Sequence, residues 1–177
     1  MANHVAVFCR QVRQRSDEHR KAVERLSGLH GQIVSILRQE LDSMVRVIYL
    51  LSISDRQRRD ELIEDCVAGR KWRVTDKEMV DLANELQSWT RSVYLFGCSF
   101  IHLSPYHDYR ERDPMEMISE KERRAILEHM RSYHGGPVGD HPSFQDLAPY
   151  LPAVFEKISS NLDCYIKDLE EDRDLEV

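Results

Sequence analysis

Apolar side chains recur at steps of three and four residues along most of the chain, which is the period of an amphipathic helix. One pattern covers residues 23–51 and predicts a long helix, bent where Gly28 and Gly31 fall. A second covers residues 79–103, which is roughly seven helical turns, and stops before Pro105. Strict alternation of apolar and polar residues, the pattern of a half-buried strand, is not found. The sequence therefore predicts a helical protein.

The ends of several helices carry capping signals. Thr75 with Glu78 and Ser119 with Glu122 each form a capping box, in which two side chains satisfy backbone N–H groups of the first helical turn. The helix that Ser119 starts is expected to end at Gly135, a residue suited to a left-handed cap. Two further helices are expected, one between Ser54 and Gly69 and one between Pro149 and Leu169. These signals divide the chain into about five helices.

The composition agrees with this division. Only 7 Gly and 6 Pro occur in 177 residues, so the chain has few of the residues that tight turns between short strands require. Hydrophobic residues make up 41% and charged residues 32%, which allows one core beneath a highly charged surface. We therefore expect an all-α, up-and-down helical bundle of about five helices, forming a single domain over residues 1–177. The acidic segment 168–177 is expected to fray.

The sequence lacks the patterns that are typical of several other classes of protein. No apolar run approaches the length of a membrane-spanning helix, and the start of the sequence lacks the layout of a secretion signal. The cysteines and histidines do not have the spacing of a metal site, and phosphate-binding glycine loops and common catalytic motifs are absent. We expect a cytoplasmic protein with no membrane association, no metal and no cofactor.

The net charge of −6 conceals an asymmetry between the two parts of the chain. Residues 1–73 contain 14 basic and 10 acidic side chains, whereas residues 74–177 contain 11 basic and 21 acidic ones. The simpler interpretation is that basic N-terminal helices pack on acidic C-terminal ones, in the same chain or in a partner chain. The alternatives are an RNA-binding face and an acidic face that binds a basic protein.

Three features of the sequence resemble the HEPN superfamily over residues 32–109. They are the first long helix with residues 42–51, the short helix that follows it, and the aromatic helix that ends with residues 96–103. The sequence is similar in particular to plasmid-borne HEPN-like proteins of unassigned activity. HEPN proteins are small helical bundles, often dimeric, and are common in bacterial defence, toxin and plasmid systems. The resemblance implies a HEPN-like bundle that forms a homodimer.

Active members of that superfamily cleave RNA without a metal, using an Arg-x4–6-His motif that is duplicated across the dimer. His102 matches the motif histidine, but Gly97 and Cys98 stand where the arginine and its polar neighbour would be. The nearest arginine on the same helix is Arg91, which lies roughly 16 Å from His102 along the axis although it shares the same face. Only an antiparallel dimer could bring Arg91 of one subunit to His102 of the other.

Asp42 and Arg46 lie one helical turn apart and are the remaining candidates for a catalytic site. Their simpler interpretation is an ion pair within one helix, and the alternative is a polar site that faces His102. In such a site the histidine would act as general base or acid on a ribose hydroxyl, and a guanidinium would stabilise charge on the phosphate.

Tyr106, His107, Tyr109 and Arg110 follow the proline that ends the aromatic helix. Aromatic side chains interleaved with basic ones can stack on bases, so these four residues are candidates for nucleic-acid binding. The simpler interpretation is a loop that seals the end of the bundle, since the acidic residues that follow repel phosphate.

The sequence thus leads to three functional hypotheses. The leading one is a HEPN-like, self-associating protein of plasmid or defence type that has no enzymatic activity. The first alternative is a metal-independent ribonuclease with a composite active site across a homodimer, formed by His102 with Arg91 or Arg46. The second alternative is a helical adaptor that binds a basic protein partner.

Overall fold

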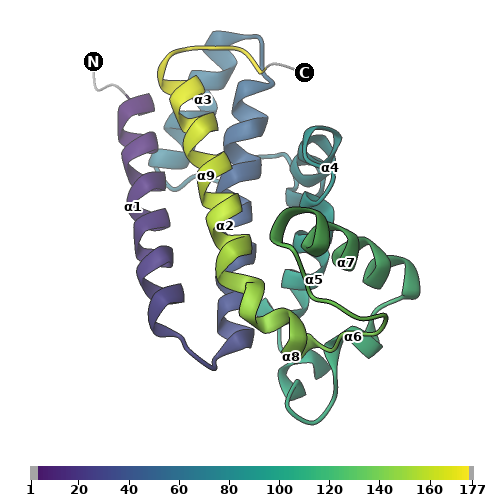
Figure 1. Ribbon diagram of the computed structural model, residues 1–177. Coiled ribbons are helices and arrows are strands. Elements are labelled where there is room, and N and C mark those ends of the chain that lie inside the picture. Colours follow the sequence, from purple (N-terminus) through teal and green to yellow (C-terminus); the bar gives the residue numbers. More distant parts are fainter. Residues whose placement is uncertain (1–3, 176–177) are drawn as a thin grey trace.

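In the computed structural model, residues 4–175 are described, and they form helices and no β-strand (Figure 1). The elements are α1 (His4–Arg25), α2 (His30–Leu51), α3 (Arg56–Val67), α4 (Asp76–Leu86), α5 (Thr90–Ile101), the 3-10 helix η1 (Pro105–Asp108), α6 (Pro114–Met117), α7 (Glu120–His134), α8 (Phe144–Leu147), the 3-10 helix η2 (Ala148–Tyr150) and α9 (Leu151–Glu170). The expected all-α class is confirmed, although the described chain has more helical elements than five.

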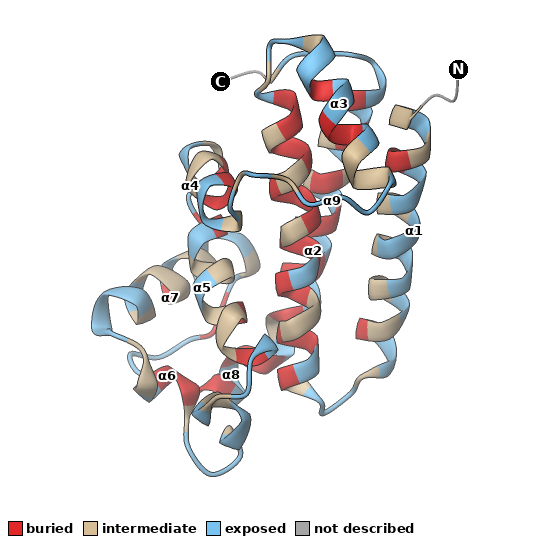
Figure 2. Ribbon diagram, turned by 180° about the vertical axis from the view of Figure 1, so that it is seen from behind, coloured by how far each residue is buried: buried red, intermediate tan, exposed pale blue. Residues whose placement is uncertain are grey.

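α2 is the central helix, and it packs against α9, α5, α1 and α4. Figure 2 shows that buried residues concentrate on α2 and α9, whereas α1 turns one side to solvent. Leu41, Met44 and Ile48 of α2 are completely buried because they recur at helical spacing on faces that neighbouring helices cover. The core therefore surrounds α2, with α1 on one side of it and α5 on the other.

α1, α2, α5 and α9 alternate in direction along the chain, as in an up-and-down bundle (Figure 1). α5 runs antiparallel to α2, because Gly97 lies beside Arg38 while Phe100 lies beside Gly31. α9 runs parallel to α2 and packs directly on it. α7 crosses beside α5, away from α1.

The expected long helix over residues 23–51 is wrong, because the chain reverses there. α1 ends at Arg25 and α2 begins at His30, and the two helices are antiparallel neighbours. Gly28 has φ +78°, a left-handed conformation that permits the tight connection and that other residues adopt at a cost. The apolar pattern continues across the reversal, so periodicity alone could not locate it.

The expected helix over residues 79–103 is interrupted at residues 87–89, where α4 ends and α5 begins. The Asn84 side-chain oxygen accepts a hydrogen bond from the backbone N–H of Arg91, at 3.2 Å, and so satisfies a free donor of the new helix. Thr90 is completely buried at the junction. A local side-chain cap therefore replaces the helical hydrogen bonds that a continuous helix would make.

Capping predictions are confirmed where the signal is local. Both capping boxes form, at Thr75 with Glu78 and at Ser119 with Glu122, and Gly135 ends α7 in a left-handed conformation. The short helix α3 is capped by Asp55, one residue after the expected cap. α9 begins later than expected, because α8 and η2 precede it.

Part of the acidic segment 168–177, which was expected to fray, lies in α9 or contacts α3. Asp168 lies within the last turns of α9. Beyond the helix, Asp172 pairs with Arg59, which is only 3% exposed, and Asp174 pairs with Arg56 at 2.9 Å. These contacts attach residues 172–174 to α3, while residues 176–177 lie outside the described chain.

Candidate functional site

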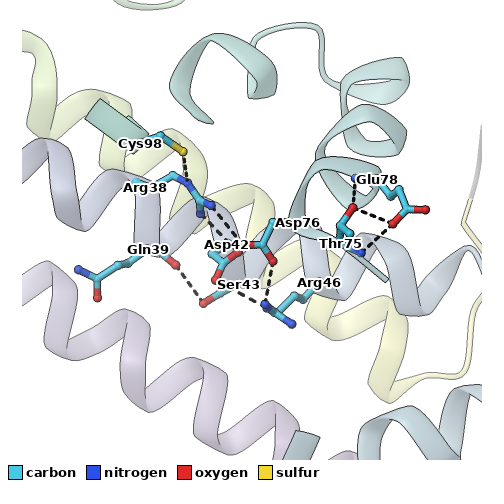
Figure 3. Close-up of polar contacts among 9 residues, drawn as sticks. All are labelled: Arg38, Gln39, Asp42, Ser43, Arg46, Thr75, Asp76, Glu78 and Cys98. Atoms are coloured by element: carbon cyan, nitrogen blue, oxygen red, sulfur yellow. Dashed lines mark hydrogen bonds and ion pairs between the residues drawn. The ribbon is translucent and has the colours of Figure 1, made fainter. Parts of the chain in front are cut away.

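The predicted pair Asp42 and Arg46 belongs to a network of four charged side chains between α2 and α4 (Figure 3). Arg46 lies 3.6 Å from Asp42 and donates a hydrogen bond of 3.1 Å to Asp76. Arg38, which sequence reasoning missed, lies 3.3 Å from Asp42 and 3.5 Å from Asp76. Two arginines therefore alternate with two aspartates, and the network has no net charge with which to attract an anion.

Arg38 is 5% exposed and also contacts α5. Its Nε lies 3.5 Å from the Cys98 sulfur, and its guanidinium lies 4.2 Å from the centroid of the Tyr94 ring. Burial works to lower the pKa of Arg38, but the contacts with Cys98 and Asp42 outweigh burial, so the pKa is raised and the group stays charged. The guanidinium thus links three helices as a permanent cation.

The two positions where the HEPN motif would have its arginine and polar neighbour are used for this contact. A Cβ at Gly97 would lie 2.6 Å from the Cβ of Arg38, so the close approach of α5 to α2 requires glycine there. Cys98 contacts the same arginine. An arginine at position 97 would displace Arg38, and the motif positions therefore serve helix packing.

His102 does not meet Arg46 in the structure. Because α5 and α2 are antiparallel, His102 lies near the start of α2, on the order of 20 Å along the axis from Arg46. The predicted polar site facing His102 is therefore wrong for a single chain, whereas the predicted ion pair of Asp42 and Arg46 is present. The chain places Arg46 within the network and His102 outside it.

Arg91 and His102 occupy opposite ends of α5, and both are exposed. Arg91 lies one residue into the helix and pairs with Asp81 of α4, at 3.5 Å. His102 follows the last helical residue and has an extended backbone, φ −109° and ψ 147°. The helix therefore presents the two groups to solvent without bringing them together.

The predicted nucleic-acid-binding residues lie at the end of the bundle, on and after η1. The Tyr106 ring packs on Phe96 and Phe100, with centroids 6.2 and 5.8 Å apart, and Tyr109 packs on Phe100 at 6.2 Å. Phe144 of α8 stacks on Phe100 at 5.5 Å. The two tyrosine rings are thus engaged in an aromatic cluster, which matches the interpretation of a sealing loop.

His107 and Arg110 lie at the solvent side of this cluster. The His107 ring is 6.2 Å from that of Phe100, and its Nδ1 contacts the backbone of Ser104 as part of the cap of η1. Arg110 is exposed. These two side chains alone remain turned to solvent out of the four predicted ones.

A groove of about 660 Å³ runs between α5 and α7. Sequence reasoning missed it, because the sequence does not reveal that α7 lies beside α5. It contains Arg91 and Tyr106 from the predicted sets, together with residues that were not predicted: Leu95, Ser99, Lys121, Ala125 and His129. Its mixture of apolar and polar side chains and its size are those of a ligand-binding surface.

The charge asymmetry of the sequence is compensated within the chain. Arg13 of α1 binds Glu170 of α9 through two hydrogen bonds, of 2.5 and 2.8 Å, and Arg20 binds Glu156. Between these pairs, the completely buried Glu40 accepts hydrogen bonds from Ser16 and the His19 ring. The basic N-terminal helices therefore pack on acidic C-terminal residues of the same chain.

Among residues 4–175, no cluster of His, Cys, Asp or Glu has the arrangement of a metal site. Within the same range, no helix is both long enough and apolar enough to cross a membrane.

Comparison with protein-family models, with curated proteins and with solved structures found no match to this chain.

Proposed function

We propose that the protein is a non-catalytic, self-associating helical-bundle protein, HEPN-like and of the plasmid or defence type, as the sequence resemblance implies. The separation of the candidate catalytic groups supports the absence of catalysis. Asp42 and Arg46 neutralise one another with Arg38 and Asp76, and His102 lies far from them. The arginine that would stabilise charge on a phosphate is therefore not placed beside the histidine that would transfer the proton.

Self-association is supported by large apolar side chains that α5 leaves exposed. Leu95 is 42% exposed on the helix, and Ile101 and Leu103, at its end, are 40% and 97% exposed. Exposed apolar residues that gather on one element mark an interaction surface. A second copy of the chain that packs on α5 would cover part of this exposed apolar area, and the exposure of these side chains is the observation that carries this proposal.

Light scattering of the purified protein at micromolar concentration tests the proposal. The wild type is expected to have the mass of a dimer, and Leu95→Asp is expected to have that of a monomer, because a buried carboxylate without a partner opposes association. Val138→Asp is the matched control, since Val138 is 86% exposed on the loop after α7. A strictly monomeric wild type would contradict self-association.

The composite ribonuclease remains the second candidate, because one observation favours it. Arg91 and His102 are exposed at opposite ends of α5, so an antiparallel second copy would bring each Arg91 toward the His102 of the other subunit. Mixed RNA incubated with the protein in EDTA separates the two functions. The non-catalytic proposal predicts no cleavage, whereas cleavage that is lost in His102→Ala and kept in His141→Ala would establish the ribonuclease.

The adaptor hypothesis has less support. Its acidic face would include Glu156, Asp163 and Glu170, and these carboxylates bind Arg13 and Arg20 of the same chain. A basic partner would have to displace those arginines before it could bind to α9.

A further inference from the structure

A small apolar cavity lies between α2, α5, α7 and α9, and it shares the lining residues Ser92, Phe96, Ile126 and His129 with the groove described above. Its free volume is about 70 Å³. The walls are formed almost entirely by apolar side chains: Val34, Leu37, Val93, Phe96, Met130, Leu147, Leu151 and Val154. A cavity with such walls excludes water and accepts hydrocarbon.

One side of the cavity carries a lysine in an unusual position. Lys157 of α9 places its ammonium 3.7 Å from the centroid of the Tyr133 ring and 5.5 Å from that of Trp89. Both rings line the same cavity, and Tyr133 is 50% exposed, so this side is where the cavity meets solvent. The aromatic faces attract the cation and hold it at the opening.

Lys157 also lacks a carboxylate partner, since no ion pair of this lysine occurs within residues 4–175. The contrast with Lys167 on the same helix is direct, because Lys167 binds Asp163 at 2.8 Å. Burial lowers the pKa of Lys157, and no carboxylate among residues 4–175 forms an ion pair that would offset this effect. An ammonium has three N–H donors, and the ring contacts leave them free to bind an anion.

Two histidines of α7, His129 and His134, also line the cavity. Burial lowers the pKa of His129 and of His134, and the charge of Lys157 lowers both further. The ring of His129 is bonded to the backbone of Ser88, and the acidic neighbour Glu128 is exposed outside the cavity. The cavity opening therefore has cationic and neutral nitrogen groups and no carboxylate among its lining residues.

We propose that this cavity binds a small aliphatic carboxylate, with its hydrocarbon chain among the apolar walls and its carboxylate on the ammonium of Lys157. The volume limits the size of the ligand. An apolar cavity of about 150 Å³ holds benzene, so about 70 Å³ suits a branched chain of a few carbon atoms. The charge of Lys157 selects an anion, and this assignment does not depend on whether the protein self-associates.

Isovalerate is a suitable probe, since it combines a short branched chain with a carboxylate. The chain contains 2 Trp, and their two indole N–H signals can be followed by NMR during a titration. Trp89 lines the cavity, whereas Trp72 donates its indole N–H to the backbone of Leu62 and is not part of the lining. Isovalerate is expected to shift the Trp89 signal to saturation and to leave the Trp72 signal in place.

Two comparisons test the role of the charge. In the wild type, isoamylamine, which has a similar chain and the opposite charge, is expected to cause no saturable shift. Lys157→Met keeps the length of the side chain, and it should weaken isovalerate binding by about tenfold or more, since a charge-assisted hydrogen bond is lost. Lys167→Met, on the same helix, should leave binding unchanged.

Either of two results would overturn the proposal. One is equal binding of isovalerate and isoamylamine by the wild type, a comparison that does not depend on how any variant folds. The other is the same affinity for isovalerate in Lys157→Met as in Lys167→Met, with native indole signals in both.

Discussion

The two sides of α2 differ in the chemistry of the side chains that line them. On the side of α1 and the C-terminal part of α9, Glu40 is completely buried and its carboxylate accepts hydrogen bonds from Ser16 and His19. Arginine–carboxylate pairs such as Arg13 with Glu170 connect α1 to α9 on this side, and charged and polar side chains line the hollow between the two helices. On the side of α5, α7 and the N-terminal part of α9, a cavity and a groove remain, and apolar residues such as Leu95 are exposed.

This difference separates stability from binding. Buried polar groups that are hydrogen-bonded stabilise a fold and specify how its helices pack. Open volume and exposed apolar area reduce stability and are what a ligand or a second chain requires. We therefore infer that the α1 side specifies the fold and that the α5–α7 side carries the function.

The largest expected change in stability is on the α1 side of α2. Glu40→Ala should lower the free energy of unfolding by about 3 kcal/mol, because it removes one member of a buried polar cluster and leaves Ser16 and His19 without their acceptor. Urea unfolding followed by circular dichroism measures the change. Glu61→Ala is the control, and it should change stability by less than about 0.5 kcal/mol, since Glu61 is exposed. Equal effects of the two substitutions would mean that the Glu40 cluster is not a stabilising element.

Two substitutions of valine by the larger leucine, one on each side of α2, compare the two sides directly. Val47 is completely buried and lies seven residues after Glu40 on the same face of α2, so Val47→Leu should cost about 1–3 kcal/mol by overpacking. Val93 lines the cavity, so Val93→Leu should change stability by less than about 1 kcal/mol. Thermal and urea unfolding of both variants give the difference. A larger cost at Val93 than at Val47 would show that the cavity side is the more tightly packed.

The smallest expected effect concerns the ion pairs at the surface. The hydrogen bond from Arg13 lowers the pKa of Glu170, so this pair stabilises the folded state above the unfolded pKa of about 4.3 and loses its effect as the pH falls. Arg13→Ala should cost at most about 1 kcal/mol at pH 7, because both side chains are partly exposed. The variant and the wild type should converge as the pH falls below the lowered pKa values of Glu170 and of Asp163, which Arg13 also contacts.

Urea unfolding at neutral and acidic pH tests this, with Arg10→Ala as the control, since Arg10 is exposed on the same helix. A difference between wild type and Arg13→Ala that stays constant with pH would mean that the ion pair with Glu170 does not contribute.

Local features of the fold could be predicted from the sequence. Thr75 with Glu78 and Ser119 with Glu122 form the expected capping boxes because every participating group lies within four residues. The reversal at Gly28 could not be predicted, because apolar spacing continues across it and a glycine in a helical pattern also permits a bend. The break before α5 depends on the Asn84 side chain, which gives no periodic signal.

Less of the candidate site could be predicted, because its residues meet only through tertiary structure. The Asp42–Arg46 pair was predictable from its helical spacing. The role of Arg38 depends on α4 and α5 both lying against α2, and that of Lys157 depends on α7 lying beside α9. The helices that contact Arg38 and Lys157 are distant from these residues in the sequence, so no local pattern indicates the contacts.

Sedimentation equilibrium at low salt and at about 1 M NaCl tests the central claim most directly, since salt at that level screens exposed charges. If the opposite charges are paired within each chain and association occurs through α5, the wild type should be dimeric at both salt concentrations, and Leu95→Asp should be monomeric at both. A wild type that is monomeric throughout, or a dimer that dissociates in high salt and is unaffected by Leu95→Asp, would contradict the account.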